Sequence, residues 1–294
     1  MNLATSRLGL VGYGEVGRIF SAGLLPHVQS VSAWDIRFAD AAGAATMGGV
    51  QQVQSMQALC EASDWVISAV TASNTLAVAQ AAAPHLRAGM VFLDLNSASP
   101  GTKQQAAALV QATGAHYVEA GVMTSVPPYG IRVPMLLGGS QAASLAAALQ
   151  ALGMDAKAVS ADIGVASAIK KCRSVMIKGL EALVIESYTT ARAYGVEAHV
   201  LPTLAETFPS IDWEKQGAYF FSRVAQHGQR RAEEMRESAR TVAEVGFAPT
   251  MASAIADKQQ WVADQARAGT FADIAPHAIW QDYADALLAR RSTL

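Results

Sequence analysis

Residues 12–17 constrain the fold of this 294-residue chain more than any other segment, because they read Gly12-Tyr13-Gly14-Glu15-Val16-Gly17. The apolar run Leu8–Val11 precedes this segment, and the helix-forming run Arg18–Leu25 follows it. In a strand–turn–helix unit, the first glycine permits a tight turn and the second lets the backbone approach a pyrophosphate. The third lets the helix pack close to the strand. The pattern predicts a dinucleotide-binding loop formed by all six residues; the alternative is a glycine turn without a ligand.

Asp35 strengthens this prediction, because it lies 18 residues after Gly17, at the end of the next apolar run, Val31–Trp34. A carboxylate at this place accepts hydrogen bonds from the adenosine ribose and repels a 2′-phosphate, which favours NAD. Arg37 leaves NADP possible, since a guanidinium binds phosphate well. The alternative for Asp35 is a simple turn residue at the strand end. The predicted cofactor site thus includes Asp35 and Arg37, together with Val70 and Thr71 at the end of another apolar run.

Short apolar runs alternate with helical patterns through the first part of the chain. The later runs are Trp65–Val70, Val91–Leu95, Tyr117–Val122 and Val133–Leu137. This alternation predicts a Rossmann-type α/β domain with a mostly parallel, doubly wound sheet, which we place at residues 1–162. Residues 163–294 indicate an all-α domain for substrate binding and dimerisation, because Val165–Tyr194 lacks proline and further helical patterns follow. We expect helix ends at Gly195, Gly246 and Gly269.

Charge supports this division and excludes several classes of protein. Residues 1–162 hold 16 charged side chains and residues 163–294 hold 30, as expected if the first part contains a sheet buried on both faces. The formal net charge of −2 argues against a nucleic-acid partner, and the apolar stretches are shorter than the roughly 20 residues of a membrane-spanning helix. Two distant cysteines favour a cytoplasmic setting, and the six histidines lack paired metal-ligand spacing. We therefore expect no nucleic acid, no membrane and no metal.

Together with the glycine-rich loop, three further segments resemble the β-hydroxyacid dehydrogenase superfamily, which includes 3-hydroxyisobutyrate and 6-phosphogluconate dehydrogenases. Asp94–Ser97 stands where the superfamily has an acidic residue and small polar residues near substrate and nicotinamide. Glu119–Ser125 stands at the place of the D-A-P-V-S-G-G substrate loop, and Gly164–Lys170 matches the glycine-rich helix start before the catalytic lysine. The resemblance covers most of residues 7–195. It implies the Rossmann fold and hydride transfer, with Lys170 as the catalytic residue.

The departures from the superfamily argue against 6-phosphogluconate as the substrate. The substrate loop lacks the tandem glycines, and Ser174 replaces an asparagine four residues after the lysine. Arg173 and Ile177 replace a histidine and an acidic residue of the 6-phosphogluconate enzyme. Val122–Pro128 and Lys170–Ala182 instead resemble a branch with V-M-x-x-V-P-P and K-x-x-R-S-x-x-x-K-G-x-E-A patterns and a C-terminal helical domain of unknown function. This branch supplies a reaction class without a substrate.

Lys170 is the candidate general acid/base. Oxidation of an alcohol by nicotinamide needs a group that takes the hydroxyl proton, and a lysine whose pKa is lowered by burial and neighbouring cations meets this need. Lys170, Arg173, Ser174 and Lys178 fall near one helix face, which predicts a small anionic substrate. The alternative is a solvated basic stripe. Lys171 is rotated about 100° from Lys170 and is expected at the surface.

Other candidate substrate contacts come from loops and from a later helix. Asn96 and Ser97 follow one apolar run, where turn and N-cap chemistry is the alternative. Thr124 and Ser125 follow another run, and Met123 beside them either makes the pocket apolar or fills the core. The last candidates are His227 and Arg230, for which a solvated helix face is the default interpretation.

The sequence therefore supports three hypotheses. The first is an NAD-preferring oxidoreductase that interconverts a small β-hydroxy acid, or a related polyhydroxy acid, and its keto or semialdehyde form, with decarboxylation as an optional second step. It is expected to be a homodimer that pairs through its C-terminal helices. The second is an imine reductase, against which the retained Lys170 counts. The third is a protein that binds NAD without catalysis.

Overall fold

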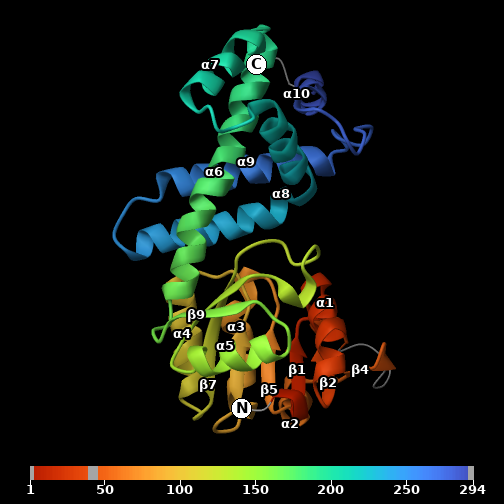
Figure 1. Ribbon diagram of the computed structural model, residues 1–294, viewed down its shortest axis with the longest axis vertical. Helices are drawn as coiled ribbons and strands as arrows, with labels where there is room; N and C mark the ends of the chain where they lie inside the picture. Colours follow the sequence, from red (N-terminus) through yellow and green to blue (C-terminus); the bar gives the residue numbers. More distant parts are fainter. Residues whose placement is uncertain (1–2, 39–45, 291–294) are drawn as a thin grey trace. The chain divides into compact units, whose positions relative to one another are not determined.

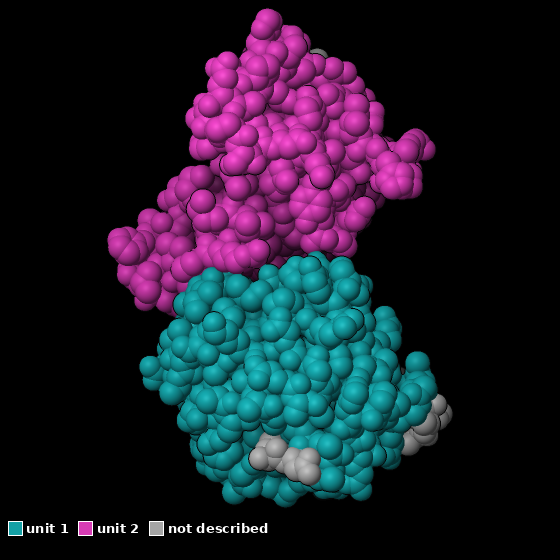
Figure 2. Space-filling view, in the orientation of Figure 1, with its two compact units in different colours: residues 1–171 teal, residues 172–294 magenta. Residues whose placement is uncertain are grey.

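The structure, a computed structural model, describes residues 3–38 and 46–290. It divides into two compact units, residues 1–171 and 172–294, which Figure 2 shows in teal and magenta. The division falls inside helix α6 (Val165–Tyr194), so the first turns of this helix belong to the first unit. The predicted domain boundary, between residues 162 and 163, lies just before the same helix. All the predicted site residues are among those described.

The first unit contains one sheet with the strand order β3-β4-β2-β1-β5-β6-β7-β8-β9 (Figure 1). The strands are β1 (Arg7–Val11), β2 (Ser30–Trp34), β3 (Thr46–Met47), β4 (Val50–Gln52), β5 (Trp65–Ser68), β6 (Val91–Asp94), β7 (His116–Val122), β8 (Met135–Gly138) and β9 (Ala156–Ser160). The pairs β3–β4 and β7–β8 are antiparallel, and the other neighbours are parallel. The predicted fold class, a mostly parallel doubly wound sheet, is confirmed. Because β1 lies between β2 and β5, the connections diverge at its carboxyl end, where ligands bind in such sheets.

Apolar clusters on both faces of the sheet explain why this unit carries few charges. Successive residues of a strand point to opposite faces. Leu10 of β1 accordingly belongs to one cluster and Val11 to the other, and Phe92 and Leu93 of β6 divide in the same way. Five helices contribute further residues to these clusters. They are α1 (Glu15–Leu24), α2 (Met56–Glu61), α3 (Thr75–Ala82), α4 (Pro100–Gln111) and α5 (Ala142–Ala151).

The second unit is helical, as predicted. It contains the remainder of α6 with α7 (Glu197–Thr207), α8 (Trp213–Glu244), α9 (Thr250–Arg267) and α10 (Trp280–Ala289). Gly195, Gly246 and Gly269 follow α6, α8 and α9 with φ angles of +68°, +86° and +80°, which confirms the predicted helix ends. The core of the unit includes an edge-on contact between Tyr188 and Trp280, whose ring centroids are 4.8 Å apart. None of the helices in the described ranges is long and apolar enough to cross a membrane.

Candidate active site

The glycine-rich loop lies between β1 and α1, and each of its glycines has its own steric environment. Gly12 has a φ of +89°, and a Cβ there would come within 2.6 Å of the Ala69 carbonyl oxygen. A Cβ on Gly17 would overlap the carbonyl oxygen of Gly12. Gly14 is different, because a Cβ there would meet nothing within 4 Å. Gly12 and Gly17 are thus required by packing, and Gly14 leaves open space before the N-terminus of α1, as a pyrophosphate needs.

The other loop residues differ in exposure. Tyr13 is buried, Glu15 is exposed in the first turn of α1, and Val16 is half-buried against the core. The loop is therefore anchored on its inner side and open on its outer side. It fits the phosphates of a dinucleotide.

Asp35 joins the glycine-rich loop to the end of β2. Its Oδ2 accepts a hydrogen bond from the backbone N–H of Tyr13 at 2.7 Å. Arg37 donates from Nε to Oδ1 at 2.7 Å and from Nη2 to Oδ2 at 2.9 Å, and it also donates to the Tyr13 carbonyl at 3.0 Å. These bonds, above all those from the Arg37 side chain, lower the pKa of Asp35 to about 2. The predicted ribose site thus holds an ionised carboxylate and a guanidinium in contact.

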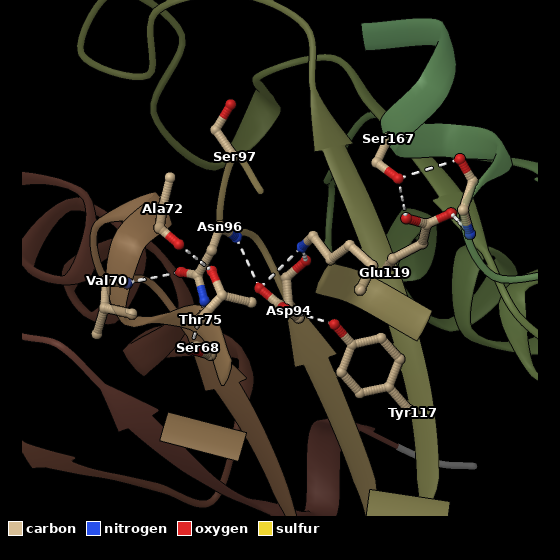
Figure 3. A network of polar contacts seen from close by, with 12 residues as sticks. Ser68, Val70, Ala72, Thr75, Asp94, Asn96, Ser97, Tyr117, Glu119 and Ser167 are labelled. Carbon is tan, nitrogen blue, oxygen red and sulfur yellow. Dashed lines mark hydrogen bonds and ion pairs between the residues drawn. The ribbon is translucent and has the colours of Figure 1, made fainter. Parts of the chain in front are cut away.

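Asn96 connects the carboxyl ends of β5 and β6 (Figure 3). Its Oδ1 accepts from the backbone N–H of Val70 at 2.7 Å, and its Nδ2 donates to Ser68 Oγ at 3.0 Å. Its own backbone N–H donates to Asp94 Oδ1 at 2.8 Å. Asn96 is only 3% exposed, so its visible role is to hold the neighbouring loops in place. Its predicted contact with a substrate stays a prediction.

A buried ionic group lies beneath this loop; the sequence pointed to Asp94 through the resemblance, but not to its partners Lys103 and Tyr117. Lys103 of α4 places its Nζ 2.9 Å from Asp94 Oδ1 and donates to the Asp94 carbonyl at 3.0 Å. Tyr117 of β7 donates to Asp94 Oδ2 at 2.5 Å. Burial and the Asp94 carboxylate raise the pKa of Tyr117 well above its usual value, so the phenol remains a donor. The signal in the sequence was a single lysine in an otherwise uncharged helix, Pro100–Gln111.

Glu119 of β7 positions the start of α6, and with it Lys170. The fully buried carboxylate accepts from the backbone N–H groups of Gly164 and Ala166 at 2.7 and 3.0 Å, and from Ser167 Oγ at 2.7 Å. A carboxylate at a helix N-terminus satisfies unpaired donors and interacts favourably with the helix dipole. Figure 3 shows Glu119 against this end of the helix.

Gly121, two residues further along β7, lets the same helix lie close to the strand. A Cβ at this position would come within 2.9 Å of the Ala166 carbonyl oxygen and within 3.5 Å of the Lys170 Cβ. Lys170 therefore lies over the carboxyl end of β7 and is half-buried. This is the edge of the sheet at which α/β proteins bind their ligands.

Lys171 corrects one expectation from the sequence. It was expected at the surface, but it is 1% exposed. Its Nζ donates to the Ser97 carbonyl oxygen at 2.5 Å and to Ser97 Oγ at 3.2 Å. The rotation of about 100° between successive helix residues is real, but it turns Lys171 toward the loop after β6. The two lysines thus face the ends of two neighbouring strands.

The predicted substrate loop, Glu119–Ser125, begins inside β7, and only its last three residues follow the strand. The backbone N–H of Met123 donates to the Pro134 carbonyl at 2.9 Å, and the Met123 side chain is half-buried. Thr124 is exposed and Ser125 is half-buried. Thr71, predicted at the cofactor, is exposed, and its Oγ1 accepts from Asn74 Nδ2 at 2.8 Å.

Two of the predicted residues of the second unit, Lys178 and Arg230, pair with Glu234 of α8. Lys178 Nζ lies 2.8 Å from Glu234 Oε2 and 3.4 Å from Ser174 Oγ. Arg230 Nε lies 3.9 Å from Glu234 Oε1. Arg173 is exposed, and His227 is half-buried. Glu234 offsets part of the positive charge on which the prediction of an anionic substrate relied. The substrate contacts of these residues stay predictions; they are Arg173, Ser174, Lys178, His227 and Arg230.

Within residues 3–38 and 46–290, no three His, Cys, Asp or Glu side chains come together in a way that could hold a metal ion.

Comparison with protein-family models shows the family to which the chain belongs. A family model described as the NAD binding domain of 6-phosphogluconate dehydrogenase matches residues 7–164, more than half of the chain. The chain belongs to the β-hydroxyacid dehydrogenase superfamily. A second model, described as Domain of unknown function (DUF1932), matches residues 191–262. The two matches confirm the superfamily and the branch that the motifs predicted.

Several solved structures are similar to this chain in fold. A conserved hypothetical protein from Sinorhizobium meliloti has a TM-score of 0.79 and 35% identity, covering 98% of this chain and 97% of that one. The 3-hydroxyisobutyrate dehydrogenase of Mycobacterium tuberculosis, described with L-serine, has a TM-score of 0.71 and 18% identity, covering 98% and 100%. A reductive aminase from Aspergillus terreus, in complex with NADPH and ethyl levulinate, has a TM-score of 0.56 and 20% identity, covering 98% and 100%. The last two likenesses, below 25% identity, concern the fold alone.

Within the β-hydroxyacid dehydrogenase superfamily, this protein departs at the first residue of the substrate loop, where Glu119 stands in place of aspartate. The longer side chain contacts two backbone N–H groups and one hydroxyl at the start of α6. The acidic character of the position is kept, and the helix that carries Lys170 is held by it. Residues 7–164 form an NAD(P)-binding domain.

Proposed function

We propose that the protein is an NAD-preferring oxidoreductase that transfers a hydride between nicotinamide and the hydroxyl-bearing carbon of a small β-hydroxy acid or related polyhydroxy acid. The observation that carries this proposal is the position of Lys170. The lysine packs over Gly121 at the carboxyl end of β7, on a helix whose start is held by the buried Glu119. This arrangement supports a role for Lys170 at the carboxyl edge of the sheet, where α/β proteins bind their ligands.

In the proposed reaction, the cofactor transfers the hydride and the protein transfers the proton. The nicotinamide, when bound, accepts or returns the hydride. Lys170, in its neutral form, takes the hydroxyl proton as the alcohol is oxidised and returns it in the reverse direction. Ser97, Thr124 and Ser125 supply hydroxyl donors near the ends of β6 and β7 and orient the oxygens of the substrate.

The protein offers matching groups for each part of NAD. The open space at Gly14 and the N-terminus of α1 receive the pyrophosphate. Asp35 accepts hydrogen bonds from the ribose hydroxyls, and its negative charge disfavours a 2′-phosphate. The preference for NAD over NADP rests on this carboxylate.

The test is a screen of β-hydroxy acids with NAD and NADP in parallel, followed by Lys170→Met. We expect kcat to fall by about 10²-fold or more, since general acid/base groups contribute on that scale, while the Kd for NAD stays within about twofold. Lys157→Met is the matched control, because Lys157 is an exposed lysine on the edge strand β9. Near-normal turnover by Lys170→Met would contradict the assignment.

The same screen separates the alternative functions. Cofactor binding without turnover of any hydroxy acid, ketone or imine favours a non-catalytic NAD-binding protein. Reduction of C=N bonds without oxidation of hydroxy acids favours an imine reductase. Release of CO2 during oxidation identifies a decarboxylating reaction.

We also propose that the protein is a cytoplasmic homodimer that associates through its helical unit. Met176, Leu183 and Tyr219 support this, because they are large apolar side chains that are 66%, 57% and 52% exposed. Light scattering during gel filtration should give twice the mass of the chain, and Leu183→Glu should shift the protein toward the monomer. A monomer at micromolar concentration would overturn this proposal.

A further inference from the structure

Lys171 and Ser97 form a pair of hydrogen bonds at the carboxyl edge of the sheet, directly beside the proposed reaction site. The ammonium of Lys171 is almost completely buried, whereas Ser97 is half-buried. Nζ contacts both the carbonyl oxygen and the Oγ of the same serine. One lysine therefore engages both acceptor atoms of a residue that the sequence assigns to the substrate.

The chemistry of the two groups determines the direction of these bonds. An ammonium carries only donors, so both oxygens of Ser97 accept from Lys171. The carbonyl oxygen, which would otherwise recognise an N–H group of a ligand, is thereby engaged. The hydroxyl proton of Ser97 is directed away from Lys171 and remains available as a donor. In Figure 3 the Ser97 hydroxyl points away from the buried Asp94 network.

The burial of Lys171 needs a reason beyond filling space. An apolar side chain of similar length would fill the same volume without the desolvation penalty of a buried cation. The ammonium adds positive potential next to Ser97, which a neutral side chain does not. A cation and an oriented hydroxyl donor together suit an oxygen atom that carries negative charge.

We propose that Lys171 acts as a positioning residue that fixes Ser97 as a hydrogen-bond donor, so that the site selects a carboxylate oxygen of the substrate over an uncharged amide or an amine. This inference rests on the proposed function, and it narrows the substrate to oxygen acids. Lys170 remains the proton-transfer group, and Lys171 acts through Ser97.

The test measures ligand selectivity by binding, so that it does not depend on turnover. Isothermal titration calorimetry is carried out on the protein saturated with NADH, in which a hydroxy acid binds without being oxidised, and the ligands are 3-hydroxypropanoate, 3-hydroxypropanamide and 3-aminopropan-1-ol. We expect the carboxylate to bind at least about tenfold more tightly than the amide, as one hydrogen bond to a charged group allows. Lys171→Met and Ser97→Ala should each reduce this ratio to about twofold or less.

Conservative and remote variants separate positioning from a purely structural role. Lys171→Arg keeps a cationic donor and should retain most of the selectivity, and Lys157→Met should retain all of it. Ser97→Ala keeps the carbonyl contact, so it serves if Lys171→Met does not fold. The double variant should lose no more selectivity than either single variant.

Two results would overturn the inference. One is a Lys171→Met protein that binds all three ligands more weakly but with an unchanged carboxylate-to-amide ratio, which indicates a structural role alone. The other is wild-type protein that binds the amine as tightly as the carboxylate. If the selectivity depends on Lys171 but no hydroxy acid is oxidised, the proposed function fails and the inference about Ser97 stands.

Discussion

Arg37 and Asp35 are joined by two side-chain hydrogen bonds, from Nε to Oδ1 at 2.7 Å and from Nη2 to Oδ2 at 2.9 Å. The carboxylate that would repel a 2′-phosphate thus holds the guanidinium that would bind one. The Asp35 side chain is 11% exposed and the Arg37 side chain is 60% exposed, so the guanidinium is the more accessible of the two charges. We expect the selectivity between NAD and NADP to depend on which of the two groups faces the ribose, the Asp35 carboxylate or the Arg37 guanidinium.

The first prediction concerns cofactor selectivity. Asp35→Ser removes the negative charge and releases Arg37 from its ion pair, so the kcat/KM ratio of NAD to NADP should fall by about tenfold or more. Steady-state kinetics with both cofactors measures the ratio. Asp64→Asn is the control, because it breaks the surface ion pair of Arg7 and Asp64, which lies away from the loop. A wild-type preference for NADP would contradict the role assigned to Asp35.

The second prediction concerns the pH dependence of stability. The pKa of Asp35 is lowered to about 2 in the folded protein, chiefly by the Arg37 side chain, against about 3.9 for an unfolded chain. A depressed folded pKa adds stability above the unfolded pKa, and this stability disappears as the pH falls toward 2. Wild-type protein should therefore be more stable than Arg37→Gln at pH 6, and the difference should shrink between about pH 4 and pH 2. Urea unfolding at a series of pH values measures it, and a difference that does not vary with pH would argue against the pairing.

The third prediction separates two glycines of the same loop. Gly17→Ala places a methyl group on the Gly12 carbonyl oxygen and should lower the free energy of unfolding by several kcal/mol. Gly14→Ala meets no atom within 4 Å in the protein alone, so its stability should change by less than about 1 kcal/mol. It should instead raise the Kd for NAD by about tenfold or more, because the methyl group enters the space of the pyrophosphate. Equal effects of the two substitutions on folding would contradict this division of roles.

Patterns that depend on neighbours in sequence could be predicted. The glycine-rich loop, the strands with continuous apolar runs and the helix ends at Gly195, Gly246 and Gly269 all carry local signals. The strands β3, β4 and β9 were not predicted. Thr46–Met47 and Val50–Gln52 are too short for an apolar run, and Ala156–Ser160 is an edge strand interrupted by the exposed Lys157. Short edge strands bury little, so they leave little signal in the sequence.

The site was predicted less completely than the fold, because contacts between distant residues have no local signature. Lys171 is rotated from Lys170 as helix geometry requires, but only the fold shows that Ser97, 74 residues earlier, lies on that side. Lys178 was expected to face a substrate, and its partner Glu234 comes from another helix. The electrostatic environment of a charged side chain thus depends on the packing of whole elements.

The fourth prediction concerns the buried group of Asp94, Lys103 and Tyr117, in which each residue is no more than 1% exposed. Lys103→Met leaves the Asp94 carboxylate without its cation, so the free energy of unfolding should fall by about 3–5 kcal/mol. Tyr117→Phe removes one hydrogen bond to the same carboxylate and should cost about 1–3 kcal/mol. Urea unfolding at pH 7 measures both changes, and Lys157→Met should change stability by less than about 0.5 kcal/mol.

A double variant distinguishes the value of the ion pair from the penalty of breaking it. Lys103→Met combined with Asp94→Asn removes both charges, and the asparagine still offers an acceptor to Tyr117. The double variant should therefore be more stable than Lys103→Met alone by about 1 kcal/mol or more. It should also raise the KM for the substrate, since Asp94 Oδ1 accepts from the backbone N–H of Asn96, directly before Ser97. A Lys103→Met protein as stable as wild type would contradict the role assigned to this ion pair.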